Sequence, residues 1–217
     1  MTERLLPPRF LFRVSQPCLL REPVWTSKES PLGDEYKLVE FERLDSRPVF
    51  ADVRAAWSSA GLTFNVRVNG KRRPVRCDEG SPAQSDGLHL WIDTRDTHNI
   101  HRATRFCHGF VFLPAGSGRK RSDPFAEQLL IHRAKENAKR VAQGKLQVRS
   151  QQRVDGYLLE AFIPAEALTG FDPDEHSKLG FTYAVRDHEL GEQTYAAGGE
   201  FPYYEDPSLW GTLELVS

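Results

Sequence analysis

The chain has 217 residues, of which 39% are hydrophobic, and its 29 Lys and Arg nearly balance 30 Asp and Glu, for a net charge of −1. This balance gives no sign of a nucleic-acid or membrane-surface partner. No apolar run approaches the roughly 20 residues that a membrane span requires.

The first residues and the cysteines of the chain favour a cytoplasmic location. Three widely spaced cysteines are typical of a reducing compartment and do not form a disulfide framework. The first residues lack the basic start and the long apolar core of a secretion signal. We therefore expect a cytoplasmic location.

The first third of the chain contains several candidate strands. Residues 1–34 are interrupted by prolines, and we expect an irregular extension with one short strand around Phe10–Val14. Tyr36–Leu44 is rich in β-formers and is predicted to be a strand. The alternating runs Val53–Trp57 and Leu62–Val68 flank a tight turn, which predicts a hairpin.

Residues 85–113 hold the clearest pattern. Leu88, Leu90 and Ile92 alternate with polar and aromatic residues, which predicts a strand with one face in the core. Phe106–Leu113 is apolar on both faces, as expected of an inner strand. The polar residues 94–104 between them predict a long loop, so this segment is expected to be an antiparallel hairpin with a functional loop.

The second half of the chain adds further strands and the main ambiguity. Phe125–Gln143 has the spacing and composition of a helix, with a strand through Leu129–His132 as the alternative. Asp155-Gly156 predicts a tight hairpin turn between Leu146–Arg149 and Tyr157–Ile163.

The remaining segments complete the expected fold. Pro164–Leu168 predicts a short helical turn, Leu179–Asp187 a strand, Gly198–Pro207 an aromatic-rich loop and Leu209–Leu215 a final strand. Together the patterns predict an all-β protein, an antiparallel jelly-roll β-sandwich with one or two short helices. We expect a single domain over residues 1–217, with 1–34 packed on it.

Five segments in this order resemble the family 9 carbohydrate-binding modules and related DOMON-like domains. They are ADVRAAWSSAGLTFNVRV (51–68), SDGLHLWIDT (85–94), GYLLEAFIP (156–164), LGFTYAVRD (179–187) and DPSLWGTLEL (206–215). The resemblance implies a jelly-roll sandwich that binds a carbohydrate ligand and is not catalytic. No nucleotide-binding or hydrolase motif is present to suggest an enzyme.

The resemblance also implies where a sugar would bind. The family holds a sugar between two aromatic side chains; the first falls at about Ala83, which cannot stack, and the second at about Tyr204, which can. A carboxylate position of the family falls at His89. The expected carbohydrate-binding residues are His89, Trp91, Asp93, Arg95, Tyr203, Tyr204 and Glu205.

The polar loop and the fold also allow three other interpretations. His98, His101 and His108 are metal-ligand residue types, so the loop could hold Ca or Zn in a metal-binding protein or a metal-dependent enzyme. In a simpler interpretation, Asp93 and Asp96 only pair with nearby arginines. A third interpretation is an interaction domain that kept the fold and lost the sugar site.

Overall fold

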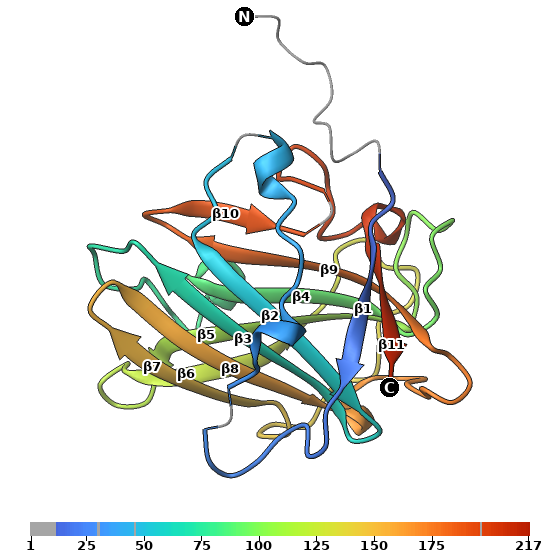
Figure 1. The fold of residues 1–217 in the computed structure, drawn as a ribbon, viewed down its shortest axis with the longest axis horizontal. Coiled ribbons are helices and arrows are strands. Elements are labelled where there is room, and N and C mark those ends of the chain that lie inside the picture. The colour runs from blue at the N-terminus through green and yellow to red at the C-terminus, as the bar shows by residue number, and fades with distance from the viewer. Residues whose placement is uncertain (1–11, 30, 46, 196) are drawn as a thin grey trace, which may run out of the picture.

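The computed structural model describes residues 12–29, 31–45, 47–195 and 197–217. Its strands are β1 Ser15–Leu20, β2 Ala51–Ser58, β3 Gly61–Asn69, β4 Gly87–Asp93, β5 Cys107–Ser117, β6 Asp123–Leu129, β7 Gln147–Arg153, β8 Gly156–Pro164, β9 Lys178–Asp187, β10 Gly191–Thr194 and β11 Gly211–Val216 (Figure 1). Helical structure in the described residues is confined to short 3-10 turns. The all-β prediction is confirmed.

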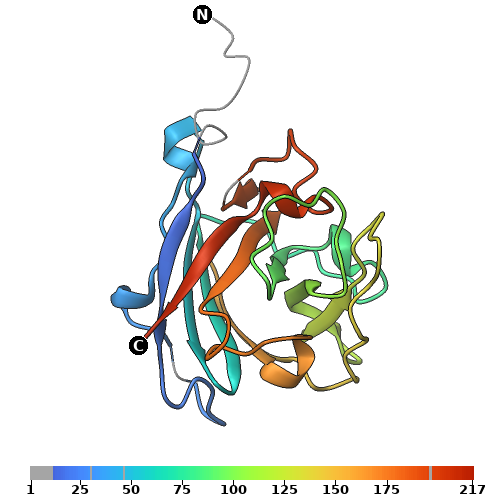
Figure 2. The same cartoon turned by 90° about the vertical axis from the view of Figure 1, so that its right-hand side faces the viewer.

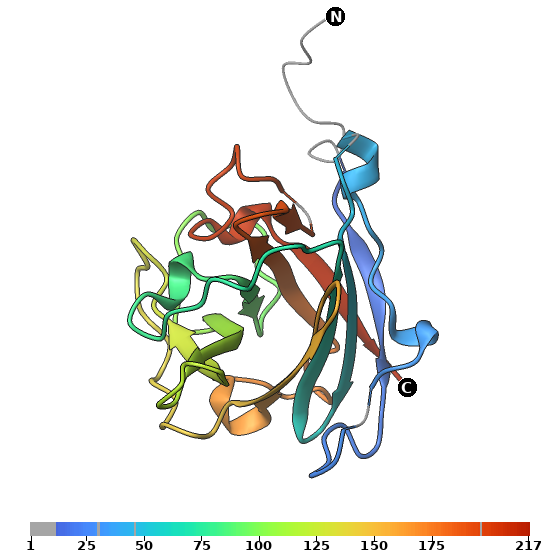
Figure 3. The same cartoon turned by 90° about the vertical axis from the view of Figure 1, so that its left-hand side faces the viewer.

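The strands form one mixed sheet of 11 strands that folds over on itself. Its order is β6-β5-β4-β9-β11-β1-β2-β3-β8-β7, with β10 paired to β9. Figures 2 and 3 show the blue and teal strands as one wall and the green and yellow strands facing it. The two ends of the order, β6 and β7, lie in contact, so the sheet nearly closes. The fold is therefore a sandwich whose two layers belong to one sheet.

The main core fills the space between the layers. Alternate residues of β2, β3, β4, β8 and β9 point inward, as period-two patterning requires. Phe64 on β3 stacks on Phe181 on β9 with ring centroids 5.7 Å apart. Both hairpins predicted from turn signals are present, β2–β3 before Gly61 and β7–β8 before Gly156.

Strand β1 departs from the predicted antiparallel arrangement. It runs parallel to both β2 and β11, and it lies within the N-terminal segment that was expected to be irregular. The short strand expected around Phe10–Val14 falls partly outside the described residues, and its described part is not a strand.

The helix predicted for Phe125–Gln143 is wrong. Its first part is strand β6, which pairs with β5 from Leu129 opposite Gly109 to Asp123 opposite Ser117. Helix propensity differs by less than about 1 kcal/mol between ordinary residues, and pairing with an inner strand outweighs it. Leu129 ends β6, so the alternative strand is also misplaced.

The strand predicted for Tyr36–Leu44 is also wrong. Only Lys37 forms a bridge, opposite Arg54, and the ends of the segment are the 3-10 turns Asp34–Tyr36 and Glu42–Asp45. Glu42 is fully buried and accepts hydrogen bonds from both the backbone and the hydroxyl of Thr194. The segment therefore covers β10 and does not extend the sheet.

One buried amide ties the two layers together at this end. Gln193 on β10 is fully buried, and its Oε1 accepts hydrogen bonds from the backbone N–H groups of Phe50 and Ala51 at 3.0 and 2.9 Å. Its Nε2 donates to the carbonyl of Ala51 at 2.8 Å.

In the described part of the chain, no helix is long and apolar enough to cross a membrane.

We expect Gln193→Ala to lower the free energy of unfolding by about 2 kcal/mol or more, because two buried N–H groups lose their acceptor. Urea unfolding measures the change. Gln152→Ala on β7, where the side chain is exposed, serves as the matched control and should be nearly neutral. Equal effects of the two substitutions would contradict the role assigned to Gln193.

Candidate functional site

The outer face of β4, β5 and β9 carries a second apolar cluster. Loops from three parts of the chain cover this face, and Trp91 on β4 retains only 4% exposure. Tyr203 packs edge-on against Trp91 with ring centroids 5.4 Å apart. We call this cluster the second core; it consists of Trp91, Ala103, Cys107, Ile131, Ala184, Ala197, Tyr203 and Trp210.

His89 lies beside the second core and is fully buried. Its ring is nearly parallel to that of Trp91, with centroids 6.3 Å apart, and its Nε2 lies 3.2 Å from the carbonyl oxygen of Ser85. Burial, together with the charge of Arg186, lowers the pKa of His89 to about 3. The ring is therefore neutral and donates to Ser85. His89, Trp91 and Tyr203 were all predicted to contact a ligand, and the structure places all three away from solvent.

Arg186 on β9 joins the two loops that flank this buried face. Its guanidinium donates to the carbonyl of Ala83 at 2.7 Å, to the hydroxyl of Tyr203 at 3.3 Å and to Glu192 at 2.8 Å. The loop before β4 and the loop after β10 are thus held on one cation. Neither Arg186 nor Glu192 was predicted to be a functional residue. The sequence signal that could have marked Arg186 is a charged residue at the end of the apolar run LGFTYAV.

Tyr204 is the predicted aromatic residue that does reach solvent. It is 45% exposed, and its ring rests edge-on against Tyr203 with centroids 5.8 Å apart. Next to it, Glu205 accepts a hydrogen bond from His132 Nδ1 at 2.8 Å and lies 3.8 Å from Arg133. Buried Tyr203 therefore anchors an exposed aromatic side chain beside an oriented carboxylate.

A second imidazole–carboxylate pair follows immediately in the chain. His101 Nδ1 lies 3.1 Å from Asp206 and 3.1 Å from the hydroxyl of Ser208, which itself donates to Asp206 at 2.6 Å. Both histidines are largely exposed, at 79% for His101 and 76% for His132. We call this surface the Tyr204 rim; it consists of His101, His132, Tyr204, Glu205, Asp206 and Ser208.

The remaining predicted residues of the loop hold its shape. Asp93 is buried and accepts hydrogen bonds from the backbone N–H groups of Arg95 and Thr97. The guanidinium of Arg95 donates to the carbonyl of Gly170 at 2.7 Å and lies 4.6 Å above the ring of Phe106. Asp93 and Arg95 therefore have internal partners, and their first role is to fix the loop.

The structure does not bring the three candidate metal ligands together. His98 lies between Asp96, at 2.8 Å, and the hydroxyl of Thr212, at 3.0 Å. His108 is buried opposite Ile92 on β4 and stacks on Phe110, inside the main core. Burial lowers the pKa of His108 to about 4. His101 lies on the Tyr204 rim, so the three histidines are in three separate environments.

In the described ranges, one group of three metal-ligand residues lies close together, and a lysine side chain already neutralises it. Asp86, Asp187 and His188 place ligand atoms within 4.8 Å of one another. The buried ammonium of Lys71 contacts Asp187, lies 3.6 Å from Asp86 and lies 4.0 Å from Glu189. His188 also pairs with Asp86. Lys71 thus supplies the positive charge that these carboxylates require.

Comparison with known proteins places this geometry in context. The family described as carbohydrate family 9 binding domain-like matches residues 22–217. A family 9 carbohydrate binding module from Caldicellulosiruptor kristjanssonii, solved in complex with cellotriose, has 14% sequence identity and a TM-score of 0.60, and the match covers 94% of both chains. Its complex with glucose gives 14% identity and a TM-score of 0.61, covering 93% of this chain and 95% of that chain. No curated protein matches the sequence.

We expect the free energy of unfolding to fall as the pH is lowered from 6.5 to about 4. The pKa values of His89, about 3, and His108, about 4, lie below the value of about 6.5 in an unfolded chain. In this window the unfolded state binds more protons, so each histidine lowers the free energy of unfolding by up to about 1.4 kcal/mol per pH unit as pH falls. His108→Phe should reduce this slope in urea unfolding at a series of pH values. A slope unchanged from the wild type, or reduced equally by His176→Gln, would contradict the assignment.

We expect Lys71→Ala to lower the free energy of unfolding by about 3–5 kcal/mol, because Asp86 and Asp187 would remain buried without their ammonium. The measurement is the shift of the urea midpoint. Arg72→Ala provides the control, since its side chain is exposed and its loss should change stability by less than about 0.5 kcal/mol. A Lys71→Ala protein as stable as Arg72→Ala would show that the ion cluster does not hold this end.

Proposed function

The chain belongs to the carbohydrate family 9 binding domain-like family, and we propose that it is a non-catalytic module that binds a glycan through the Tyr204 rim. The family and the fold support carbohydrate binding in general. The particular observation that carries the assignment to this surface is the exposed ring of Tyr204, fixed from beneath by Tyr203.

The chemistry of the rim suits a sugar. A sugar ring has a carbon–hydrogen face that packs on an aromatic ring, and an edge of hydroxyl groups that need donors and acceptors. Tyr204 supplies the aromatic surface. Glu205 and Asp206 supply acceptors, and each is oriented by the imidazole of His132 or His101. In the described residues, Nε2 of neither imidazole has a hydrogen-bond partner, so both can contact a ligand.

The proposed site differs from the pattern that the resemblance implies. Ala83 offers no second aromatic surface, yet Arg186 holds its backbone beside Tyr203. His89, at a position where the resemblance implies a carboxylate, is buried and neutral. We therefore propose recognition by one aromatic surface and a polar border. This arrangement favours a ligand that extends along the rim over a single enclosed sugar.

We expect Tyr204→Ala to weaken binding of cellotriose at least about tenfold, equivalent to about 1.4 kcal/mol, because the stacking surface is lost. Tyr204→Phe keeps the ring and should retain most of the affinity. Isothermal titration calorimetry on the whole chain gives the constants, with Tyr36→Ala as a control tyrosine on a different segment.

Two results would argue against this site. Unchanged affinity in Tyr204→Ala would place the sugar elsewhere on the domain. Absence of binding by the wild type to cellotriose and to a panel of neutral polysaccharides would favour an interaction domain that kept the fold without the sugar site.

A further inference from the structure

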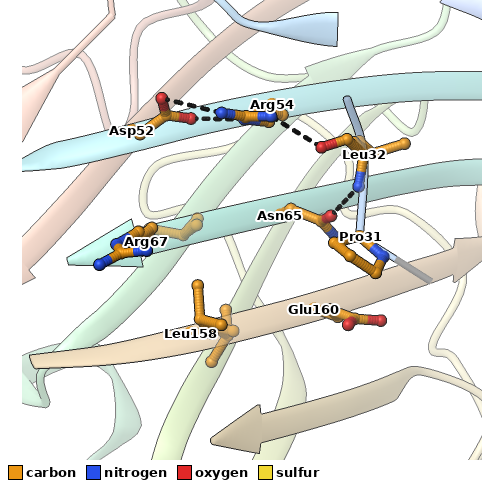
Figure 4. A pocket seen from close by; sticks show the side chains of 10 residues that line it. Pro31, Leu32, Asp52, Arg54, Asn65, Arg67, Leu158 and Glu160 are labelled. Atoms are coloured by element: carbon orange, nitrogen blue, oxygen red, sulfur yellow. Dashed lines mark hydrogen bonds and ion pairs between the residues drawn. The ribbon is translucent and has the colours of Figure 1, made fainter. Parts of the chain in front are cut away.

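A notch of about 230 Å³ opens on the opposite layer, on the outer face of β2, β3 and β8 (Figure 4). It shares no lining residue with the Tyr204 rim. Its volume lies below the roughly 300–1,000 Å³ of pockets for drug-sized ligands. The space therefore matches a small ligand or the end of a longer one.

The floor of the notch consists of two rows of side chains that cross three strands. Strand pairing aligns Asp52 with Arg67 and Arg67 with Leu158 in the first row. The second row aligns Arg54 with Asn65 and Asn65 with Glu160 in the same way. Because side chains alternate along a strand, all six point away from the main core.

One wall of the notch is the backbone at Leu32, and the second row holds it in place. The N–H of Leu32 donates to Asn65 Oδ1 at 2.6 Å, and Arg54 donates to the carbonyl of Leu32 at 2.8 Å (Figure 4). Leu32 itself is buried, with 3% exposure. The second row is thus occupied in anchoring this segment, and the first row is the part that can meet a ligand.

The charges of the notch balance and are largely satisfied internally. Asp52 accepts hydrogen bonds from Arg54 and lies 3.3 Å from Lys37. Glu160 is bound by Arg149 at 2.6 Å. Arg54 also pairs with Asp34 at 2.7 Å, and Lys37 pairs with Glu40 at 2.8 Å. Counted with these partners, four carboxylates and four cationic groups leave no net charge, so the notch favours neither an anion nor a cation.

Arg67 and Leu158 are the two residues of the notch that remain available to contact a ligand. Arg67 donates from Nε to Asn69 Oδ1 at 2.8 Å, and within the described residues its terminal nitrogens reach no acceptor. Leu158 lies next to it across the strand pair and offers a carbon surface. A guanidinium with free donors beside an aliphatic floor matches a ligand with hydroxyl groups on its edge and carbon–hydrogen bonds on one face.

We propose that this notch is a second carbohydrate site, which takes one uncharged sugar ring with Leu158 under its carbon face and Arg67 donating to its hydroxyl groups. The inference rests on the proposed function, since it assumes that the domain meets glycans. It adds a separate surface, on the layer opposite the second core, so that one domain could hold two chains or two parts of one chain.

The test follows backbone amide signals of the isotope-labelled whole chain by NMR during titration with cellotriose, and in parallel with trigalacturonate as an acidic trisaccharide. We expect cellotriose to shift two groups of amides, residues 65–67 with 158–160 at the notch, and residues 203–206 at the rim. Arg67→Ala should weaken the notch response at least about fivefold and leave the rim response unchanged. Tyr204→Ala should do the reverse, and exposed Arg153→Ala should change neither.

Each outcome separates the two sites. Rim shifts without notch shifts overturn the second site and leave the proposed function standing. Notch shifts without rim shifts support the second site and overturn the assignment to Tyr204. A notch that responds as strongly to trigalacturonate as to cellotriose overturns the neutral-sugar assignment, and a chain that responds to neither trisaccharide at either surface overturns both proposals.

Discussion

The structure depends on one layer that is covered on both faces. Every residue of β4 and nearly every residue of β5 is buried. The inner face packs against β2, β3 and β8, and the outer face packs against the loops of the second core. This double burial withdraws His89 and Trp91 from solvent. It also fixes Tyr203, and through it the neighbouring Tyr204, so the surface proposed for binding is a consequence of how the outer face is covered.

Local patterns predicted the parts of the fold that local chemistry determines. The alternation of Leu88, Leu90 and Ile92 and the Asp155-Gly156 turn correctly predicted β4 and the β7–β8 hairpin. Strand β1 pairs with β11 across nearly the whole chain, and no short-range signal marks such a partner. Residues 123–129 form a strand because they pair with β5, and this pairing outweighs the helical composition of the segment.

The candidate site shows the same division. Tyr204 and Glu205 were predicted as ligand contacts from residue type and the family resemblance, and the structure shows that Tyr204 is exposed. His132 and Arg186 were not predicted, because the role of each depends on a partner that only the fold brings close. The histidine-rich loop illustrates the opposite error: ligand residue types cluster in the sequence, yet neighbouring positions on a strand and a loop face different surroundings. Where the fold does gather buried carboxylates, it supplies the ammonium of Lys71.

The parallel pairing of β1 with β11 has a mechanical consequence. Ser15 lies opposite Thr212 and Leu19 lies opposite Val216, so the start of β1 and the end of β11 are at opposite ends of the paired segment. Tension applied between these two points pulls the strands along their length in opposite directions and loads all their hydrogen bonds together. An antiparallel pair pulled from one end would open bond by bond. The geometry of the first and last strands therefore makes the β1–β11 pair a shear clamp between the two ends of the domain.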